Sequence, residues 1–167
     1  FAGLQELRDL NKPVIAAVNG DAIGGGMEIV LACDLCVAVP TARFSLPEPR
    51  VGLAASGGLH RLARQLPLKQ AMELALTGRM LTADEAVGIG IVNQLSPSPA
   101  DDGGALALAL ETGALICENA PLAVRATKEM MMRGLDWSGL EAAYAGQNPA
   151  FETLLGSEDA REGRLSV

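Results

Sequence analysis

Two short apolar runs, separated by a glycine-rich loop and a helical segment, constrain the fold of this chain most strongly. The first run is Val14–Val18 and the second is Leu35–Val39. Each has five consecutive apolar residues, the pattern of a strand that is covered on both faces. Between them lie the loop 19–26 and the segment 27–33, which predicts a helix. Strands and a helix in alternation indicate an α/β fold.

The rest of the chain predicts strands in the first half and helices in the second. The further expected elements are a helix over 1–10, an extended segment at 43–46, helices near 59–66, 68–76 and 82–88, a strand at 91–95, and helices near 105–118, 122–133, 138–147 and 150–162. Thr82 precedes Glu85 by three positions, which is typical of a capping box at the start of a helix. The segment 96–104 predicts a surface connection.

Composition restricts the classes of protein to which the chain can belong. It has 167 residues, of which 49% are hydrophobic, enough for the core of an ordinary domain. The net charge of −7 argues against a nucleic-acid partner. No apolar run approaches the roughly 20 residues that span a bilayer, so we expect no membrane segment. Three cysteines fit a reducing compartment, and we expect a cytoplasmic location.

A glycine-rich turn is followed by two glutamates that could perform acid–base chemistry. Glu28 follows Gly24-Gly25-Gly26, and Glu48 ends the segment Phe44–Glu48. A helix that starts in such a turn presents backbone N–H groups without intrahelical partners at its positive end. Glycine also lets a substrate oxygen approach the backbone closely. The turn is therefore suited to hold a carbonyl oxygen that becomes an oxyanion, with carboxylates beside it.

Each of these features also has a purely structural interpretation. Glycines often allow a helix to pack closely on a strand, and a glutamate in the first turn stabilises a helix through the macrodipole. Glu48 lies between two prolines and could be an exposed loop residue. The joint occurrence of the glycine turn and both carboxylates in one short block favours the catalytic interpretation.

Other polar residues favour a structural role. Cys33 and Cys36 form a Cys-x-x-Cys, but structural zinc needs two further ligands and only Cys117 and His60 remain. We therefore expect no metal site, and interpret the pair as small buried residues at a helix–strand junction. His60 is expected at the surface or in loop packing. Two arginines, Arg61 and Arg64, could contact phosphates or be ordinary charges on a helix surface.

Several motifs agree in identity, order and spacing with those of a known family. They are Lys12–Gly20, Gly24–Glu28, Cys33-Asp34, Phe44–Glu48, Val51–Leu53, Gly57-Gly58, Leu76–Arg79, Gly90–Asn93 and Ser157–Gly163. By these motifs the chain resembles the enoyl-CoA hydratase/isomerase (crotonase) family over nearly its whole length. The resemblance implies a crotonase-like α/β fold, a ββα superhelix. Residues 1–104 would be the C-terminal portion of the spiral core, and 105–167 a helical trimerisation region.

The resemblance also implies roles for individual residues. Gly25 would offer its N–H to the thioester oxygen of an acyl-CoA, and Gly24, Gly26 and Gly57 would line the substrate site. The catalytic residues would be Glu28 and Glu48, which hold a water molecule between them. Glu28 would help deprotonate this water as it adds at the β-carbon, and Glu48 would protonate the α-carbon. The implied activity is reversible hydration of a 2-enoyl-CoA without a cofactor, since coenzyme A is part of the substrate.

The same resemblance leaves other activities open. An enoyl-CoA isomerase can work with one acid–base residue at the Glu48 position, whereas glutamate at both positions favours hydration or dehydration. The segments Ser45–Glu48 and Ser157–Ala160 also resemble the carnitinyl-CoA dehydratase branch. A non-catalytic acyl-CoA-binding subunit is the alternative from another class. The family implies a homotrimer or a dimer of trimers.

Two departures from the family pattern support the alternative of a non-catalytic acyl-CoA-binding subunit. Family members carry about a hundred further residues, the length of one domain, before the position of Phe1. We therefore expect this chain to be an incomplete portion of a longer protein. The loop Gly52–Gly58 is one residue shorter than is usual in the family. A deletion there would shift the loop that borders the reacting carbons.

Overall fold

The computed structural model describes residues 3–7, 9–97 and 103–165. The chain divides into two compact units, which are described separately. The first unit comprises Phe1–Arg8 and Val14–Gly113, and the second comprises Asp9–Pro13 and Ala114–Val167. All described strands belong to the first unit, and all the candidate site residues lie there.

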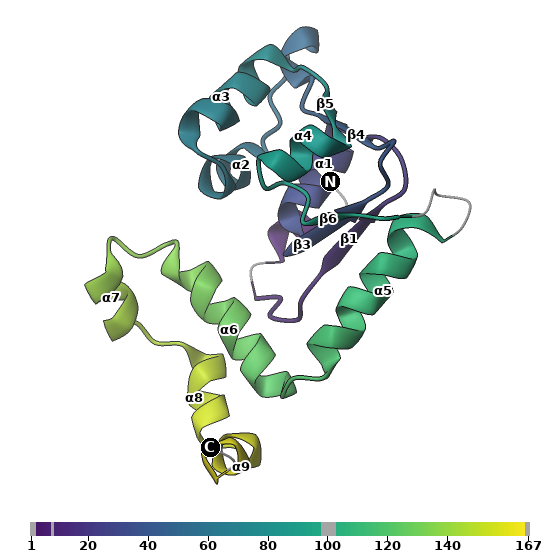
Figure 1. Ribbon diagram of the computed structural model, residues 1–167. Helices are drawn as coiled ribbons and strands as arrows, with labels where there is room; N and C mark the ends of the chain where they lie inside the picture. Colours follow the sequence, from purple (N-terminus) through teal and green to yellow (C-terminus); the bar gives the residue numbers. More distant parts are fainter. Residues whose placement is uncertain (1–2, 8, 98–102, 166–167) are drawn as a thin grey trace. The chain divides into compact units, whose positions relative to one another are not determined.

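The first sheet is parallel and has the order β1-β3-β6 (Figure 1). Its strands are β1 (Ile15–Val18), β3 (Leu35–Ala38) and β6 (Gln94–Leu95). The two apolar runs thus form neighbouring strands, as predicted. The strand predicted at 91–95 is shorter than expected. The N–H groups of Ile91 and Val92 both donate to Ala86 O, at 2.9 and 3.1 Å, so these residues close a helix end instead of joining the ladder.

The second sheet joins β2 (Ala22–Ile23), β4 (Arg43–Ser45) and β5 (Leu81–Thr82) in the order β2-β4-β5. Strand β2 runs parallel to β4, and β5 runs antiparallel to it. The extended segment predicted at 43–46 is confirmed by β4. The other two strands were not predicted, because two residues are too few to leave a recognisable alternation.

Helix α1 (Gly25–Ala32) connects the two sheets in sequence and begins two residues earlier than predicted. It buries Met27, Val30 and Leu31 in the core. Asp34 follows the helix, and its carboxylate accepts a hydrogen bond from Val14 N at 2.7 Å while its own N–H donates to Val14 O at 2.9 Å. The start of β1 is thereby tied to the end of α1.

Three short helices follow the second glutamate, as predicted. They are α2 (Leu59–Gln65), α3 (Leu68–Thr77) and α4 (Ala83–Gly88). The capping box before α4 is confirmed, because Glu85 N donates to Thr82 Oγ1 at 3.2 Å and Thr82 N donates to Glu85 Oε2 at 2.8 Å. Helix α3 ends at Gly78, which adopts a φ of 57°.

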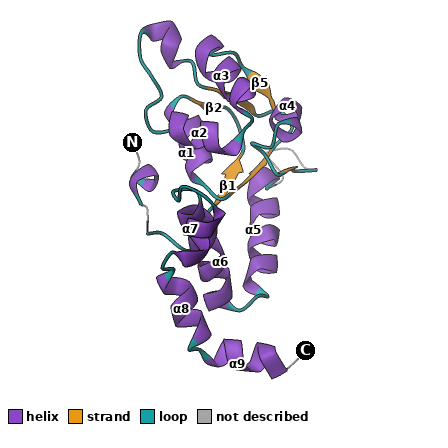
Figure 2. Cartoon of the chain, turned by 90° about the vertical axis from the view of Figure 1, so that its left-hand side faces the viewer, coloured by secondary structure: helices purple, strands orange, loops and turns teal. Residues whose placement is uncertain are grey.

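The remaining elements are helical, as Figure 2 shows. They are α5 (Gly104–Cys117), α6 (Pro121–Gly134), α7 (Leu140–Ala145), α8 (Pro149–Leu155) and α9 (Glu158–Leu165). The prediction of one helix near 150–162 was wrong. Helix α8 ends at its C-cap Gly156. Ser157 Oγ then accepts a hydrogen bond from Ala160 N at 3.2 Å, and a new helix begins.

The helix predicted over 1–10 was also wrong. The described part of this segment contains one 3₁₀ turn, η1 (Leu4–Glu6), preceded by Gly3 with a φ of 75°. Ten residues are too few for a helix to overcome its nucleation cost unless it buries an apolar face. None of the residues of η1 is buried. Residues 1–2 and 8 of this prediction, and 98–102 of the predicted surface connection, lie outside the described residues.

Aliphatic side chains form most of the core, with Phe44 fully buried among them. This agrees with the low aromatic content of the chain. Within the described ranges, no single helix is long and apolar enough to cross a membrane, although α5 and α6 pass the same test of length and composition when taken together as a bent pair.

Candidate active site

The glycine turn lies between β2 and α1 and is fixed from both sides. Gly24 N donates to Ser45 O of β4 at 2.9 Å, and Glu28 N donates to Gly24 O at 3.0 Å. Gly24 has a φ of 56°, a conformation that favours glycine. Gly25 is the first residue of α1, so its N–H has no partner within the helix. A role for Gly25 in an oxyanion hole therefore stays a prediction that is compatible with the local backbone.

Glu28 lies in the first turn of α1 and is 8% exposed. Its Oε1 accepts a hydrogen bond from Gly57 N at 2.8 Å, and its Oε2 lies 3.5 Å from Gln5 Nε2. A β-carbon at Gly58 would lie 3.1 Å from Glu28 Cγ, so this glycine leaves room for the glutamate stem. Both carboxylate oxygens of a largely buried acid are thus held by donors from other segments.

Glu48 begins the 3₁₀ turn η2 (Glu48–Val51) after Pro47. Its carbonyl accepts a hydrogen bond from Leu53 N at 3.0 Å, which fixes the backbone of the loop. The side chain reaches the glycine turn, since a β-carbon at Gly24 would lie 3.1 Å from Glu48 Oε1. Oε2 is buried, and among the described residues it has no hydrogen-bond partner. Such an atom is unfavourable in a folded protein, and a catalytic role is one explanation for it.

The structure therefore brings four of the predicted site residues to one place: Gly24, Glu28, Glu48 and Gly57 are linked by the contacts above. Gly26 lies one position inside α1, and a β-carbon there would have no heavy atom within 4 Å. None of these residues is shown to bind a substrate, and their roles stay predictions.

Sequence reasoning missed the role of Gly78 beside the Glu48 loop. Ser45 Oγ donates to Gly78 O at 3.1 Å. A β-carbon at Gly78 would lie 3.1 Å from Pro47 Cα and 3.3 Å from Leu46 O. The end of α3 thus packs directly against the backbone that precedes Glu48. The signal was the glycine after Thr77, which lies in the motif Leu76–Arg79 and to which we assigned no individual role.

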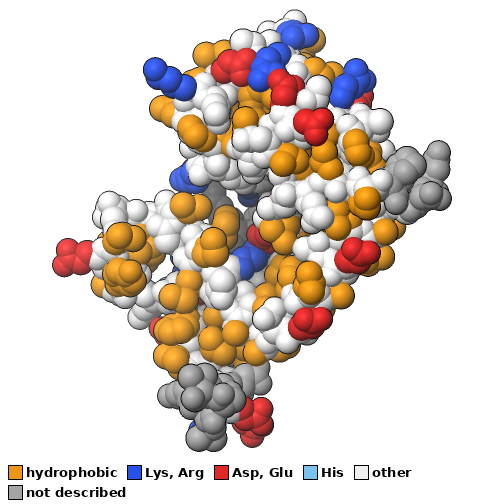
Figure 3. Space-filling view, viewed as in Figure 1, with side chains coloured by type: hydrophobic (Ala, Val, Ile, Leu, Met, Phe, Trp, Pro, Cys, Tyr) orange, Lys and Arg blue, Asp and Glu red, His pale blue; other side chains and the backbone are white. Residues whose placement is uncertain are grey.

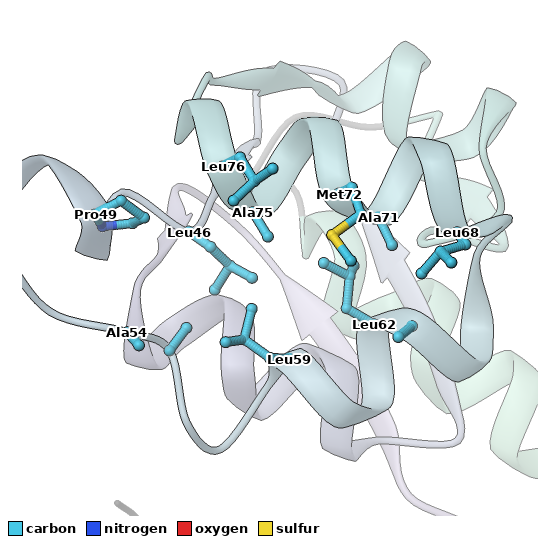
Figure 4. A pocket seen from close by; sticks show the side chains of 12 residues that line it. Leu46, Pro49, Ala54, Leu59, Leu62, Leu68, Ala71, Met72, Ala75 and Leu76 are labelled. Carbon is cyan, nitrogen blue, oxygen red and sulfur yellow. The ribbon is translucent and has the colours of Figure 1, made fainter.

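An apolar cavity of about 290 Å³ adjoins the loop that carries Glu48 (Figure 4). Leu46 and Pro49, on either side of Pro47 and Glu48, line one part of it. Leu59 and Leu62 of α2 and Met72 of α3 line the other part, and all the lining residues are apolar. This cavity offers an apolar surface beside the loop that carries Glu48.

Two of the three cysteines, Cys33 and Cys36, lie where the end of α1 meets β3. Cys36 is buried in β3, and burial, with a smaller contribution from Cys33, raises the pKa of its thiol to about 12. Cys33 is half-buried at the end of α1, so the pair occupies the predicted helix–strand junction. In the part of the chain that the structure describes, no group of three His, Cys, Asp or Glu side chains could hold a metal ion.

Comparison with known proteins assigns the family. Residues 1–166 match the family described as enoyl-CoA hydratase/isomerase. The chain is 43% identical over 171 aligned residues to a protein named carnitinyl-CoA dehydratase from Salmonella arizonae, which covers 99% of this chain and 64% of the relative. The chain belongs to the enoyl-CoA hydratase/isomerase family. It spans about 64% of the length of the curated relatives that it matches first.

Solved structures agree with this assignment. An enoyl-CoA hydratase from Mycobacterium marinum superposes with a TM-score of 0.84 at 43% identity, covering 93% of this chain and 62% of the other. An enoyl-CoA hydratase from Bacillus anthracis superposes with a TM-score of 0.86 at 33% identity, covering 98% and 62%. The crotonase-like α/β fold with a helical C-terminal region, predicted from the sequence, is therefore confirmed.

Proposed function

We propose that this chain carries the acid–base residues of an enoyl-CoA hydratase, which adds water reversibly to a 2-enoyl-CoA thioester. The observation that carries the proposal is that both glutamates contact the segment around the glycine turn: the backbone N–H of Glu28 donates to Gly24 O, and the Glu48 side chain lies against Gly24. Glu28 is held by the N–H of Gly57, and Glu48 extends to the α-carbon of Gly24. A hydratase needs two such groups, because one must give a proton while the other takes one.

The two glutamates would divide the proton transfers. Glu28, whose oxygens already accept hydrogen bonds, would act as the base that deprotonates the attacking water. Glu48, with one buried oxygen that lacks a partner among the described residues, would carry the proton that is delivered to the α-carbon. The developing negative charge on the thioester oxygen would be stabilised by the N–H of Gly25 at the positive end of α1. One such donor contributes about 3 kcal/mol to transition-state stabilisation.

The acyl portion of the substrate would lie against apolar surface. The cavity beside the Glu48 loop is suited to an apolar acyl group, because Leu46, Leu59 and Met72 line it and none of the lining residues is charged. No cofactor is needed for this reaction, because the coenzyme A thioester itself activates the double bond.

A second candidate is dehydration of carnitinyl-CoA. The curated relatives with 42–43% identity bear the name carnitinyl-CoA dehydratase, which favours this candidate. Loss of water from a β-hydroxyacyl thioester is the reverse of the hydration described above, so the same two glutamates would serve it. The two candidates differ in the group attached to the acyl chain, not in the chemistry at the turn.

The experiment is hydration of a short 2-enoyl-CoA by the full chain, followed by the loss of absorbance of the conjugated thioester. The Glu48→Gln variant and carnitinyl-CoA as an alternative substrate are measured beside it. Turnover that falls by about 10²- to 10⁴-fold in the variant supports the proposal. Acyl-CoA binding without any turnover would instead favour a non-catalytic binding subunit.

The proposal extends to assembly as a homotrimer or a dimer of trimers. It is supported by large hydrophobic side chains that the second unit leaves exposed: Leu140 and Tyr144 of α7 are 76% and 86% exposed. Figure 3 shows hydrophobic side chains over α7 and α6 on the face that is viewed. Exposed apolar surface of this kind often marks a protein interface. Sedimentation equilibrium would give the mass of the assembly and test this extension.

A further inference from the structure

The carboxylate of Glu28 is held by two donors that come from outside α1. Gly57 N lies in the turn before α2, and Gln5 Nε2 lies in the 3₁₀ turn η1 near the start of the described chain. Neither donor belongs to a long helix or to a sheet ladder. Further contacts are therefore needed to hold these two segments in a fixed position relative to the Glu28 carboxylate, so that its orientation does not vary.

Arg61 contacts both of these segments through one guanidinium group. Its Nη2 donates to Gln5 O at 2.7 Å, and its Nη1 donates to Gly57 O at 3.2 Å. The backbone of α2 leaves the carbonyl of Gly57 available, because Arg61 N donates to Gly58 O instead. A planar guanidinium carries several N–H donors in fixed geometry, so it can hold two carbonyls in one arrangement.

The side chain of Gln5 packs tightly at the same place. A β-carbon at Gly57 would lie 2.1 Å from Gln5 Oε1 and 2.8 Å from Gln5 Nε2. The absence of a side chain at position 57 thus lets the amide of Gln5 lie between the turn and Glu28. Arg61, Gln5, Gly57 and Glu28 form a closed set of contacts, in which both residues bound by the arginine also contact the acid.

We propose that Arg61 is a positioning residue for Glu28: it holds the carbonyls of Gln5 and Gly57, and so fixes the two donors that orient the carboxylate. The inference rests on the proposed function. It differs from both interpretations that the sequence offered for Arg61, since the guanidinium binds the protein's own backbone rather than a phosphate or solvent alone. Half-burial of the side chain agrees with this role.

Arg64 provides a matched control on the same helix. Its Nη1 donates to His60 O at 3.3 Å, the same four-residue spacing that joins Arg61 to Gly57. The carbonyl of His60 belongs to α2 itself, not to the turn that contacts Glu28. Replacement of Arg64 therefore removes one charge and a bond of the same kind to a carbonyl outside the turn that contacts Glu28.

The test compares Arg61→Gln, Arg61→Lys and Arg64→Gln in the full chain by two measurements. The first is amide hydrogen exchange at Gly57, with the amides of β3 as an internal reference. The second is the separate determination of kcat and KM for hydration of a 2-enoyl-CoA. We expect Arg61→Gln to speed exchange at Gly57 but not in β3. We also expect it to lower kcat by about 10- to 100-fold with little change in KM, because a small misplacement of a catalytic group costs this much.

The variants separate positioning from other roles. Lysine can donate to one of the two carbonyls, so Arg61→Lys should restore part of kcat, and Arg64→Gln should resemble the parent chain. The proposal is overturned by unchanged exchange at Gly57, by a rise in KM alone, or by equally faster exchange in β3 with no rescue by lysine. If the parent chain shows no hydration, the proposed function fails. Faster exchange at Gly57 in Arg61→Gln would still support the contacts by which Arg61 holds the donors of Glu28.

Discussion

The α-carbon of Gly24 faces the carboxyl group of Glu48, so that a β-carbon at position 24 would lie 3.1 Å from Glu48 Oε1. The two residues are 24 positions apart in sequence (48 − 24). The contact therefore depends on the pairing of β2 with β4, in which Ile23 lies opposite Ser45. One short parallel ladder aligns the turn before α1 with the loop after β4.

Gly24→Ala should disturb the fold and the site together. Alanine is strained at a φ of 56° and a ψ of −122°, which costs about 1–3 kcal/mol, and its β-carbon would press on the Glu48 carboxyl group. We expect a lower free energy of unfolding in urea and a lower kcat for hydration. Gly26→Ala is the control for stability only, because that glycine lies within α1 with open space around it, and the substitution should raise the free energy of unfolding by up to about 1 kcal/mol. Equal stability of the two variants would contradict the prediction.

Glu28→Gln should distinguish hydration from isomerisation. The amide oxygen of glutamine can still accept the hydrogen bond from Gly57 N, so the fold should be retained. A hydratase that uses Glu28 as its base should lose about 10²- to 10⁴-fold in kcat, whereas an isomerase that relies on Glu48 should lose less. The rates of hydration and of double-bond migration are measured on the same preparations.

Glu73→Gln serves as the control for that experiment. Glu73 lies on α3, and its Oε1 is 2.6 Å from Arg79 Nε. This ion pair is not among the contacts of the glycine turn. We expect its variant to hydrate at the parental rate. A Glu28→Gln enzyme that hydrates equally fast would remove Glu28 from the catalytic pair.

The sequence predicted the central site residues because they lie in short linear motifs. Gly24 and Glu28 are within one turn of helix, and the apolar run Leu35–Val39 reveals the neighbouring strand. The support of Glu28 could not be predicted in this way. Gly57 lies 29 positions from Glu28, and no periodic pattern encodes a contact at that separation.

Local patterns were also ambiguous where tertiary contacts decide the structure. Apolar residues in the segment 1–10 have helical spacing, yet the described residues form one 3₁₀ turn that directs Gln5 towards Glu28. Arg61 has the spacing of an ordinary helix-surface charge, and its bonds to two carbonyls depend on segments that meet after folding. Residue type and periodicity identify candidates, whereas the geometry of their support requires the fold.

Glu85 should make stability depend on pH in the acid range. Its pKa is lowered in the folded chain, first by the hydrogen bond from Thr82 N and then by that from Arg79. A depressed folded pKa gives a stabilisation that is present above the unfolded value of 4.5 and is lost as the pH falls through the folded value. The difference in unfolding free energy between the parent and Glu85→Gln should therefore shrink as the pH falls below 4.5.

Urea unfolding at several pH values between about 7 and about 3 measures this difference. Arg79→Gln is an informative companion, because it removes the lesser interaction and leaves the Thr82 N–H in place. We expect it to retain most of the pH dependence. A parent-to-variant difference that is constant with pH would show that Glu85 contributes through packing and not through its charge.

Cys36 should resist alkylation while the chain is folded. Burial raises the pKa of its thiol from 9.0 to about 12, so the reactive thiolate fraction near pH 8 falls about 1,000-fold. Cys117 is exposed at the end of α5 and should react with iodoacetamide at once. Peptide mapping by mass spectrometry after brief labelling gives the modified fraction at each position.

The same labelling in concentrated urea provides the reference for Cys36. Unfolding returns its thiol to water, so the two positions should then be modified at similar rates. Rapid modification of Cys36 in the native chain would mean that β3 opens readily at this position. The parallel pairing of β3 with β1, which includes the Ala16–Cys36 register, would then be too weak to hold the end of α1 in place. Because α1 carries Glu28, such opening would also disorder the proposed base, and hydration should decline in step with the labelling of Cys36.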